Sequence, residues 1–149
     1  MERHVALFLR SALLWLVAGS FIGATMAAHP SWLAYRPAHL HAMLLGFVMM
    51  FIAGVAYHVI PRFTMAPLES PRLARVHLVL AQAGMVLLML GVIGRVHRLG
   101  IWPSALSLGP IASLLGLWAF AWNIWRTLDA AVPVPAAMPR SRPLPNAPR

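Results

Sequence analysis

The chain has 149 residues, of which 60% are hydrophobic and only 10% are charged, and its mean hydropathy is +0.75. A soluble globular domain does not carry so large an apolar share, so the composition excludes that class and indicates a membrane protein. Cysteine is absent, which excludes disulfides, thiolate metal sites and covalent haem attachment through a C-x-x-C-H motif. The net charge of +9 has no soluble basic face to accompany it, so no nucleic-acid partner is expected.

Four apolar segments of about 20 residues each are long enough to cross a hydrocarbon core of about 30 Å. They lie near residues 6–28, 38–60, 74–93 and 102–125. Backbone groups inside a bilayer find no water to bond, and four spans cannot close a β-barrel, so each segment should be a helix. The sequence therefore predicts an all-α, four-helix transmembrane bundle over residues 1–129, embedded in the lipid bilayer.

Small residues recur along the first and the last of these segments. Gly19, Gly23 and Ala27 are spaced by four residues, a pattern that lets helix backbones approach closely in lipid. A similar stripe lines one face of the last segment: Ala105, Gly109, Ala112, Gly116, Ala119 and Asn123. We expect both stripes to pack against other helices, including helices of neighbouring subunits.

The arginines indicate how the bundle is oriented. The chain has no lysine, and its arginines divide unequally between the two sides of the predicted membrane. One side holds Arg3, Arg10, Arg62, Arg72, Arg75, Arg126, Arg140, Arg142 and Arg149, and the other holds Arg36, Arg95 and Arg98. By the positive-inside rule, both termini should be cytoplasmic in a bacterial inner membrane. The Pro-rich residues 130–149 then form an extended cytoplasmic tail.

Seven histidines accompany only three acids, and two of the histidines stand apart. His39 and His41 enter the membrane together with an apolar run, where polar side chains are functional candidates by default. Positions two apart differ by about 200° around an α-helix, so the imidazoles should leave opposite sides and serve different neighbours.

The other histidines are predicted to be satisfied by water and lipid headgroups. We expect His4 and His29 to be solvated, and we expect the rest to lie at the membrane interface: His58, His77 and His97.

The cofactor that best matches isolated histidines in a helix bundle is haem, held through axial imidazoles. Gly46 follows His39 by about two turns on the same helix face and would leave space for the macrocycle. Arg36, Arg95 and Arg98 would be placed to meet the propionates. The alternative is that His39 and His41 only cap a helix at the headgroup level.

The segment from Arg36 to Arg62 resembles the second transmembrane helix of a known catalytic subunit. It opens with Arg36, Pro37 and His39 and closes with GVAYHVIPR over residues 54–62. This pattern is similar to that of the haem–copper oxidase superfamily, and most of all to its nitric oxide reductase and high-affinity oxidase branches. The resemblance implies that His39 is an axial ligand of a low-spin haem, and it implies haem b binding and electron transfer.

The same resemblance sets a limit on what one chain can do. The family's subunit has many more helices and a copper site built from three histidines. This chain has no such histidine triad. A single copy is therefore not expected to be a complete oxidase or reductase.

A haem with two histidine ligands needs a second helix that carries a ligand. Within one chain, only His97 is predicted to lie near the depth of His39. The family's helices form similar arcs whose second helices carry ligands, and one of them uses an H-x-H to serve two haems. A homotrimer of this chain would resemble that arrangement, with His39 and His41 reaching haems on either side.

Three functions are compatible with these observations. The first is a small membrane cytochrome b that carries electrons, with a quinol as a candidate donor. The second is a haem enzyme whose site has one open position and reduces or binds nitric oxide or oxygen. The third is a cofactor-free accessory subunit of a respiratory complex.

Overall fold

The fold is a bundle of membrane-length helices. The computed structural model describes residues 2–100 and 102–131, and all secondary-structure elements in them are helical. Four helical stretches are long and apolar enough to cross a membrane: Arg3–Ala28, Pro30–Phe63, Pro71–Val96 and Trp102–Asp129. The predicted all-α, four-helix membrane fold is confirmed. Beyond residue 131, the predicted tail lies outside the described residues, and the orientation in the membrane stays a prediction.

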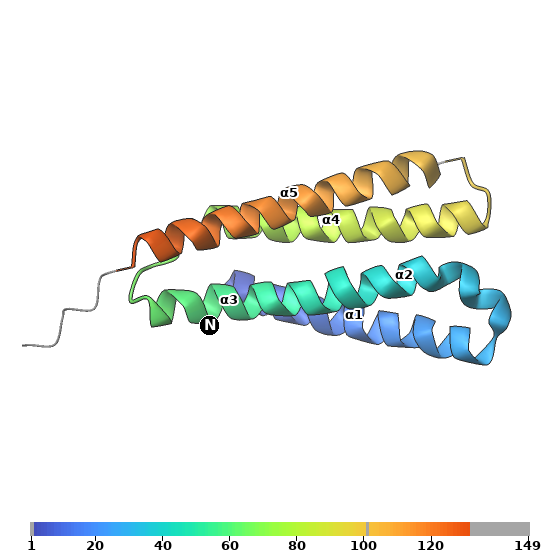
Figure 1. The fold of residues 1–149 in the computed structure, drawn as a ribbon, viewed down its shortest axis with the longest axis horizontal. Helices are drawn as coiled ribbons and strands as arrows, with labels where there is room; N and C mark the ends of the chain where they lie inside the picture. The colour runs from blue at the N-terminus through green and yellow to red at the C-terminus, as the bar shows by residue number, and fades with distance from the viewer. Residues whose placement is uncertain (1, 101, 132–149) are drawn as a thin grey trace, which may run out of the picture.

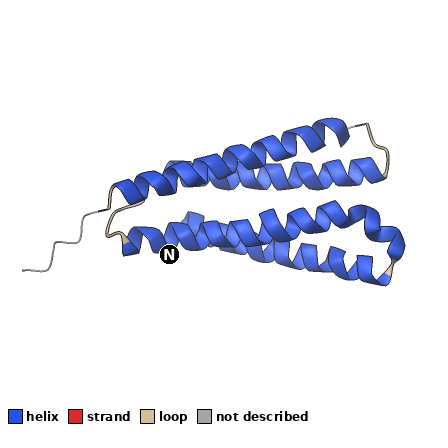
Figure 2. Cartoon of the chain, in the orientation of Figure 1, coloured by secondary structure: helices blue, strands red, loops and turns tan. Residues whose placement is uncertain are grey.

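The four spans form two antiparallel hairpins that lie side by side (Figure 1). In the first hairpin, α1 (Arg3–Ala28) packs on the second span, and in the other, α4 (Pro71–Val96) packs on α5 (Trp102–Asp129). The two helices of each hairpin pack more extensively on each other than on the other hairpin. Short loops join the helices (Figure 2). The turn within the first hairpin and the turn within the second lie at the same end of the bundle (Figure 1). We call this the hairpin end, and we call the opposite end, with the start of α1 and the end of α5, the terminal end.

Glycines bring α4 and α5 into close contact. A Cβ atom on Gly84 would lie 2.8 Å from the backbone nitrogen of Ser113 and 2.9 Å from the carbonyl oxygen of Gly109. Gly109 meets α4 in return, because a Cβ there would lie 2.9 Å from the backbone nitrogen of Leu88. The prediction that the stripe on the last helix packs against another helix is confirmed.

The glycine stripe of α1 is also used within the chain. A Cβ on Gly19 would lie 2.7 Å from Sδ of Met43, and a Cβ on Gly23 would lie 2.8 Å from Cε1 of His39. The expectation that these two stripes supply close-packing surfaces between subunits is therefore wrong for the glycines, because helices of the same chain already cover them.

Polar side chains join α4 to α5 at the terminal end. The buried Asn123 accepts a hydrogen bond from the backbone nitrogen of Ser70 at 3.0 Å and donates one to its carbonyl oxygen at 2.9 Å. The hydroxyl of Thr127 accepts from the backbone nitrogen of Glu69 at 3.1 Å. Ser70 also caps α4 by accepting from the backbone nitrogen of Leu73. These bonds hold the start of α4 against the end of α5.

The second span is not one continuous α-helix, contrary to the expectation for residues 38–60. It runs through a 3-10 helix η1 (Pro30–Tyr35), α2 (Arg36–His41), a π-helix η2 (Ala42–Met49) and α3 (Met50–Phe63). A π-helix has wider turns than an α-helix and is found frequently at functional sites. Here it begins directly after His41, and no hydrophobic period in the sequence predicts it.

Substitution of Gly84 tests the packing of α4 on α5. Gly84→Val should lower the free energy of unfolding by about 1–3 kcal/mol, because the added atoms meet backbone that cannot rotate away. Denaturation in mixed micelles, followed by circular dichroism, measures this. Gly100→Val is the matched control, since nothing lies within 4 Å of a Cβ at Gly100. Equal stability of the two variants would contradict the packing described here.

Candidate haem site

His39 is held against α1 through one ring nitrogen. Its Nδ1 lies 2.8 Å from the carbonyl oxygen of Gly19, and its ring packs on Gly23. A carbonyl oxygen only accepts hydrogen bonds, so Nδ1 carries the proton. In the neutral imidazole this leaves the Nε2 lone pair free, which is how a backbone carbonyl orients a metal-ligating histidine.

His41 is oriented in the same manner but toward a different neighbour. Its Nδ1 lies 2.7 Å from the carbonyl oxygen of Pro37, one turn earlier in α2, so here too Nε2 is the free nitrogen. The side chain of His41 lines a cavity between the hairpins, whereas His39 contacts α1. The two imidazoles therefore leave the helix toward different neighbours, as the two-residue spacing predicts.

The cavity beside His41 lies at the hairpin end and has a volume of about 470 Å³, within the usual range for small-molecule sites. Its lining comes from η1, α2, α4 and α5: Leu33, Ala34, Arg36, Pro37, His41, Leu88, Val92, Arg95, Val96 and Leu106. One histidine and two arginines thus contribute to an otherwise largely apolar lining. An apolar macrocycle with carboxylate substituents has the chemistry that fits this lining.

The remaining predicted site residues lie elsewhere. Arg98 does not line the cavity and occupies the loop after α4, where its backbone adopts a φ of 56°. His97 caps the end of α4, and its Nε2 lies 2.9 Å from the hydroxyl oxygen of Tyr35, so this pair links the two hairpins. The structure thus brings Arg36, Arg95 and His41 together and leaves His97 and Arg98 outside that group.

Gly46 has a neighbour that the sequence did not indicate. A Cβ at this position would lie 2.5 Å from Cγ of Trp15 on α1, so the indole occupies the space beside the glycine. Trp15 also donates a hydrogen bond from Nε1 to Oε1 of Gln82 on α4 at 3.1 Å, which joins the two hairpins near mid-span. Gly46 lies on the same side of the helix as His39, since both face α1.

A second polar cluster was missed at the terminal end. His77 is only 3% exposed and His4 is 7% exposed, so the predictions that they are interfacial and solvated are wrong. The hydroxyl oxygen of Tyr57 lies 3.2 Å from Nδ1 of His77, and the rings of Phe8 and Phe120 pack around the pair. The spacing of Ala74, His77, Ala81 and Gly84 along one face of α4 was the available signal for burial of His77.

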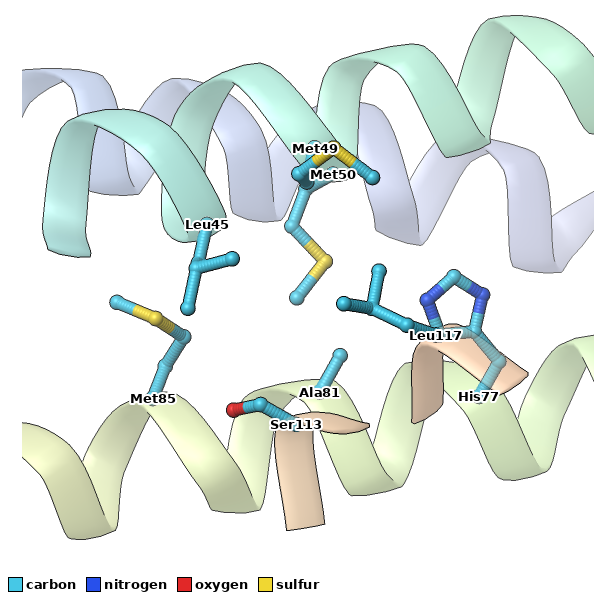
Figure 3. Close-up of a pocket in the computed structure, with 8 residues that line it drawn as sticks. All are labelled: Leu45, Met49, Met50, His77, Ala81, Met85, Ser113 and Leu117. Carbon is cyan, nitrogen blue, oxygen red and sulfur yellow. The ribbon is translucent and has the colours of Figure 1, made fainter. Parts of the chain in front are cut away.

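A small pocket next to His77 lies between the two hairpins (Figure 3). Figure 3 shows mainly apolar side chains around it, with the imidazole of His77 and the hydroxyl of Ser113 as the polar groups. Its volume is about 20 Å³, enough for about one water molecule. A macrocycle does not fit there, so the cavity at the hairpin end is the better candidate for a large cofactor.

The donor groups do not suit a multi-ligand metal ion. Within residues 2–100 and 102–131, no three histidine, cysteine or acidic side chains converge in a way that could hold one. The family's three-histidine copper centre is therefore not assembled by these residues in one chain. Separate imidazoles whose Nδ1 atoms bond backbone carbonyls are the kind of ligand that could hold a haem iron one at a time.

The sequence matches the family model described as cytochrome c and quinol oxidase polypeptide I over residues 3–139. The chain belongs to this family. The resemblance read from Arg36, Pro37 and His39 is thus confirmed at the level of the family, and this four-helix chain is an oxidase subunit I-like membrane protein. Comparisons with curated proteins and with solved structures gave no match.

Proposed function

We propose that this chain is a small membrane cytochrome b that binds haem b through His39 and His41 and transfers electrons. The observation that carries the proposal is the common orientation of the two imidazoles in a chain of the oxidase subunit I family. Each turns Nδ1 to a backbone carbonyl, at 2.8 Å and 2.7 Å, and leaves Nε2 for a ligand. When bound, haem supplies a centre that accepts and releases one electron.

The residues around His41 have defined roles in this proposal. The guanidinium groups of Arg36 and Arg95 pair with the propionates, and charge-assisted pairs of this kind are strong hydrogen bonds. Leu88, Val92 and Leu106 supply apolar wall and limit the access of water to the ring. The carbonyl oxygen of Gly19 keeps the ring of His39 fixed from the other side of the helix.

A second copy of the chain completes the haem ligation in our proposal. His39 contacts α1 and does not line the cavity of His41, so a haem in that cavity needs its second imidazole from elsewhere. His97 is already bonded to Tyr35. We therefore favour a homotrimer in a bacterial inner membrane, in which His41 of one copy and His39 of the next hold each haem.

Removal of either imidazole should remove the haem. We expect His39→Ala and His41→Ala to lose the sharp, split α and β bands of a reduced six-coordinate haem in the purified protein. His29→Ala should keep these bands, because His29 is exposed in the connection between α1 and η1. Full low-spin haem in His39→Ala would contradict the assignment, and a high-spin spectrum that responds to carbon monoxide in the unsubstituted protein would favour gas binding instead.

Arginine substitutions test where the propionates lie. A nearby positive charge disfavours the oxidised haem, which carries one more positive charge than the reduced form, so it raises the reduction potential. Arg95→Gln should therefore lower the midpoint potential by tens of millivolts in a redox titration. Arg98→Gln, outside the cavity, should change it less. Equal shifts of the midpoint potential in the two variants would contradict the placement of the propionates beside Arg95.

Native mass spectrometry of the detergent-solubilised protein tests the shared site. We expect trimers that carry haem, and we expect a mixture of His39→Ala and His41→Ala chains to recover haem in mixed oligomers. Recovery follows because an intact His39 and an intact His41 can still meet across one interface. A monomer that retains haem with two histidine ligands would defeat the shared-site proposal and would point to His97.

A further inference from the structure

Two arginines and an apolar groove lie together on the outer surface of α4 at the terminal end. The groove is shallow and open, and it is lined by residues of α4: Arg72, Arg75, Val76, Val79 and Leu80. These positions share one face of the helix, since they lie three, four, seven and eight residues after Arg72 or at Arg72 itself. Val76 is 47% exposed and Val79 is 66% exposed, so the other described residues do not cover this face.

Within residues 2–100 and 102–131, neither guanidinium group has an acidic partner. Among the described residues, the arginine that approaches a carboxylate is Arg126, which lies 3.9 Å from Glu69. Arg72 and Arg75 also lie in the first two turns of α4, where the helix dipole disfavours positive charge. Both features favour an anion that binds between or beside these two side chains.

The apolar half of the groove restricts the kind of anion. From Arg72 to Leu80 the helix rises by about 12 Å, which carries the groove from the headgroup level into the hydrocarbon region. Since α4 is long and apolar enough to span a membrane, an exposed face on it is suited to contact lipid. A molecule with a phosphate at one end and an acyl chain at the other matches both halves.

We propose that this groove, the Arg72–Arg75 groove, is a binding site for an anionic phospholipid. The phosphate contacts the two guanidinium groups, and the first part of an acyl chain lies along Val76, Val79 and Leu80. The site is on the opposite end of α4 from Arg95 and His97, so it is independent of the proposed haem site.

Retention of defined lipids by the full-length protein tests this site. The detergent-purified protein is exchanged into mixtures of phosphatidylglycerol and phosphatidylcholine with matched acyl chains, and bound lipid is counted by native mass spectrometry. We expect the unsubstituted chain to retain phosphatidylglycerol over phosphatidylcholine by about tenfold or more. Arg72→Gln/Arg75→Gln should lose this preference.

Two controls separate the groove from general charge and from a free phosphate site. Arg62→Gln removes a positive charge from the same end of the bundle, where Arg62 bonds His58, and should keep the preference. Val79→Trp should reduce retention with the charge unchanged, because the indole fills the apolar half. Inorganic phosphate should not displace the lipid.

Several results would overturn the proposal. One is equal retention of the two lipids by the unsubstituted chain, and another is an equal loss of preference in Arg62→Gln. Displacement by inorganic phosphate, or retention unaffected by Val79→Trp, would also overturn it, because the site would then recognise phosphate alone.

Discussion

The structure depends on one constraint, which is that polar groups within a bilayer must find their partners inside the protein. The side chains that meet this constraint are the ones that hold the spans in place. Trp15 and Gln82 join the two hairpins near mid-span, and Asn123 holds the start of α4 against α5. The same requirement fixes His39, whose proton must go to a carbonyl oxygen on the neighbouring helix. A polar contact needed for stability therefore also orients the candidate ligand.

The two ends of the bundle differ because of how the hairpins meet. At the terminal end, aromatic rings pack around Tyr57 and His77, and the pocket that extends from His77 toward mid-span has room for about one water molecule. At the hairpin end, a much larger and partly open cavity lies between the same two hairpins beside His41. Of these two places, a large cofactor is thus compatible only with the cavity at the hairpin end.

The π-helix between His41 and Met50 connects packing with the proposed site. Gly46 lies against the indole of Trp15, and Ala42 is fully buried, so this segment approaches α1 closely. The histidines stand in the α-helical turn just before it. Their directions are therefore set by two contacts with backbone carbonyls and by the point at which the helix widens.

The sequence by itself determined the membrane class, the four spans, the packing stripe of α5 and the family likeness at His39. These follow from local properties, namely the length of apolar runs, the spacing of small residues and a short motif, which need no knowledge of what lies across the bundle. The burial of His4 and His77 and the partner of Gly46 were decided only by the tertiary structure. So was the division of the arginines, because Arg95 lines the cavity and Arg98 does not. The physical reason is that the burial of a side chain depends on how each helix is rotated about its axis relative to its neighbours. Many small contacts between segments distant in the sequence determine these rotations together.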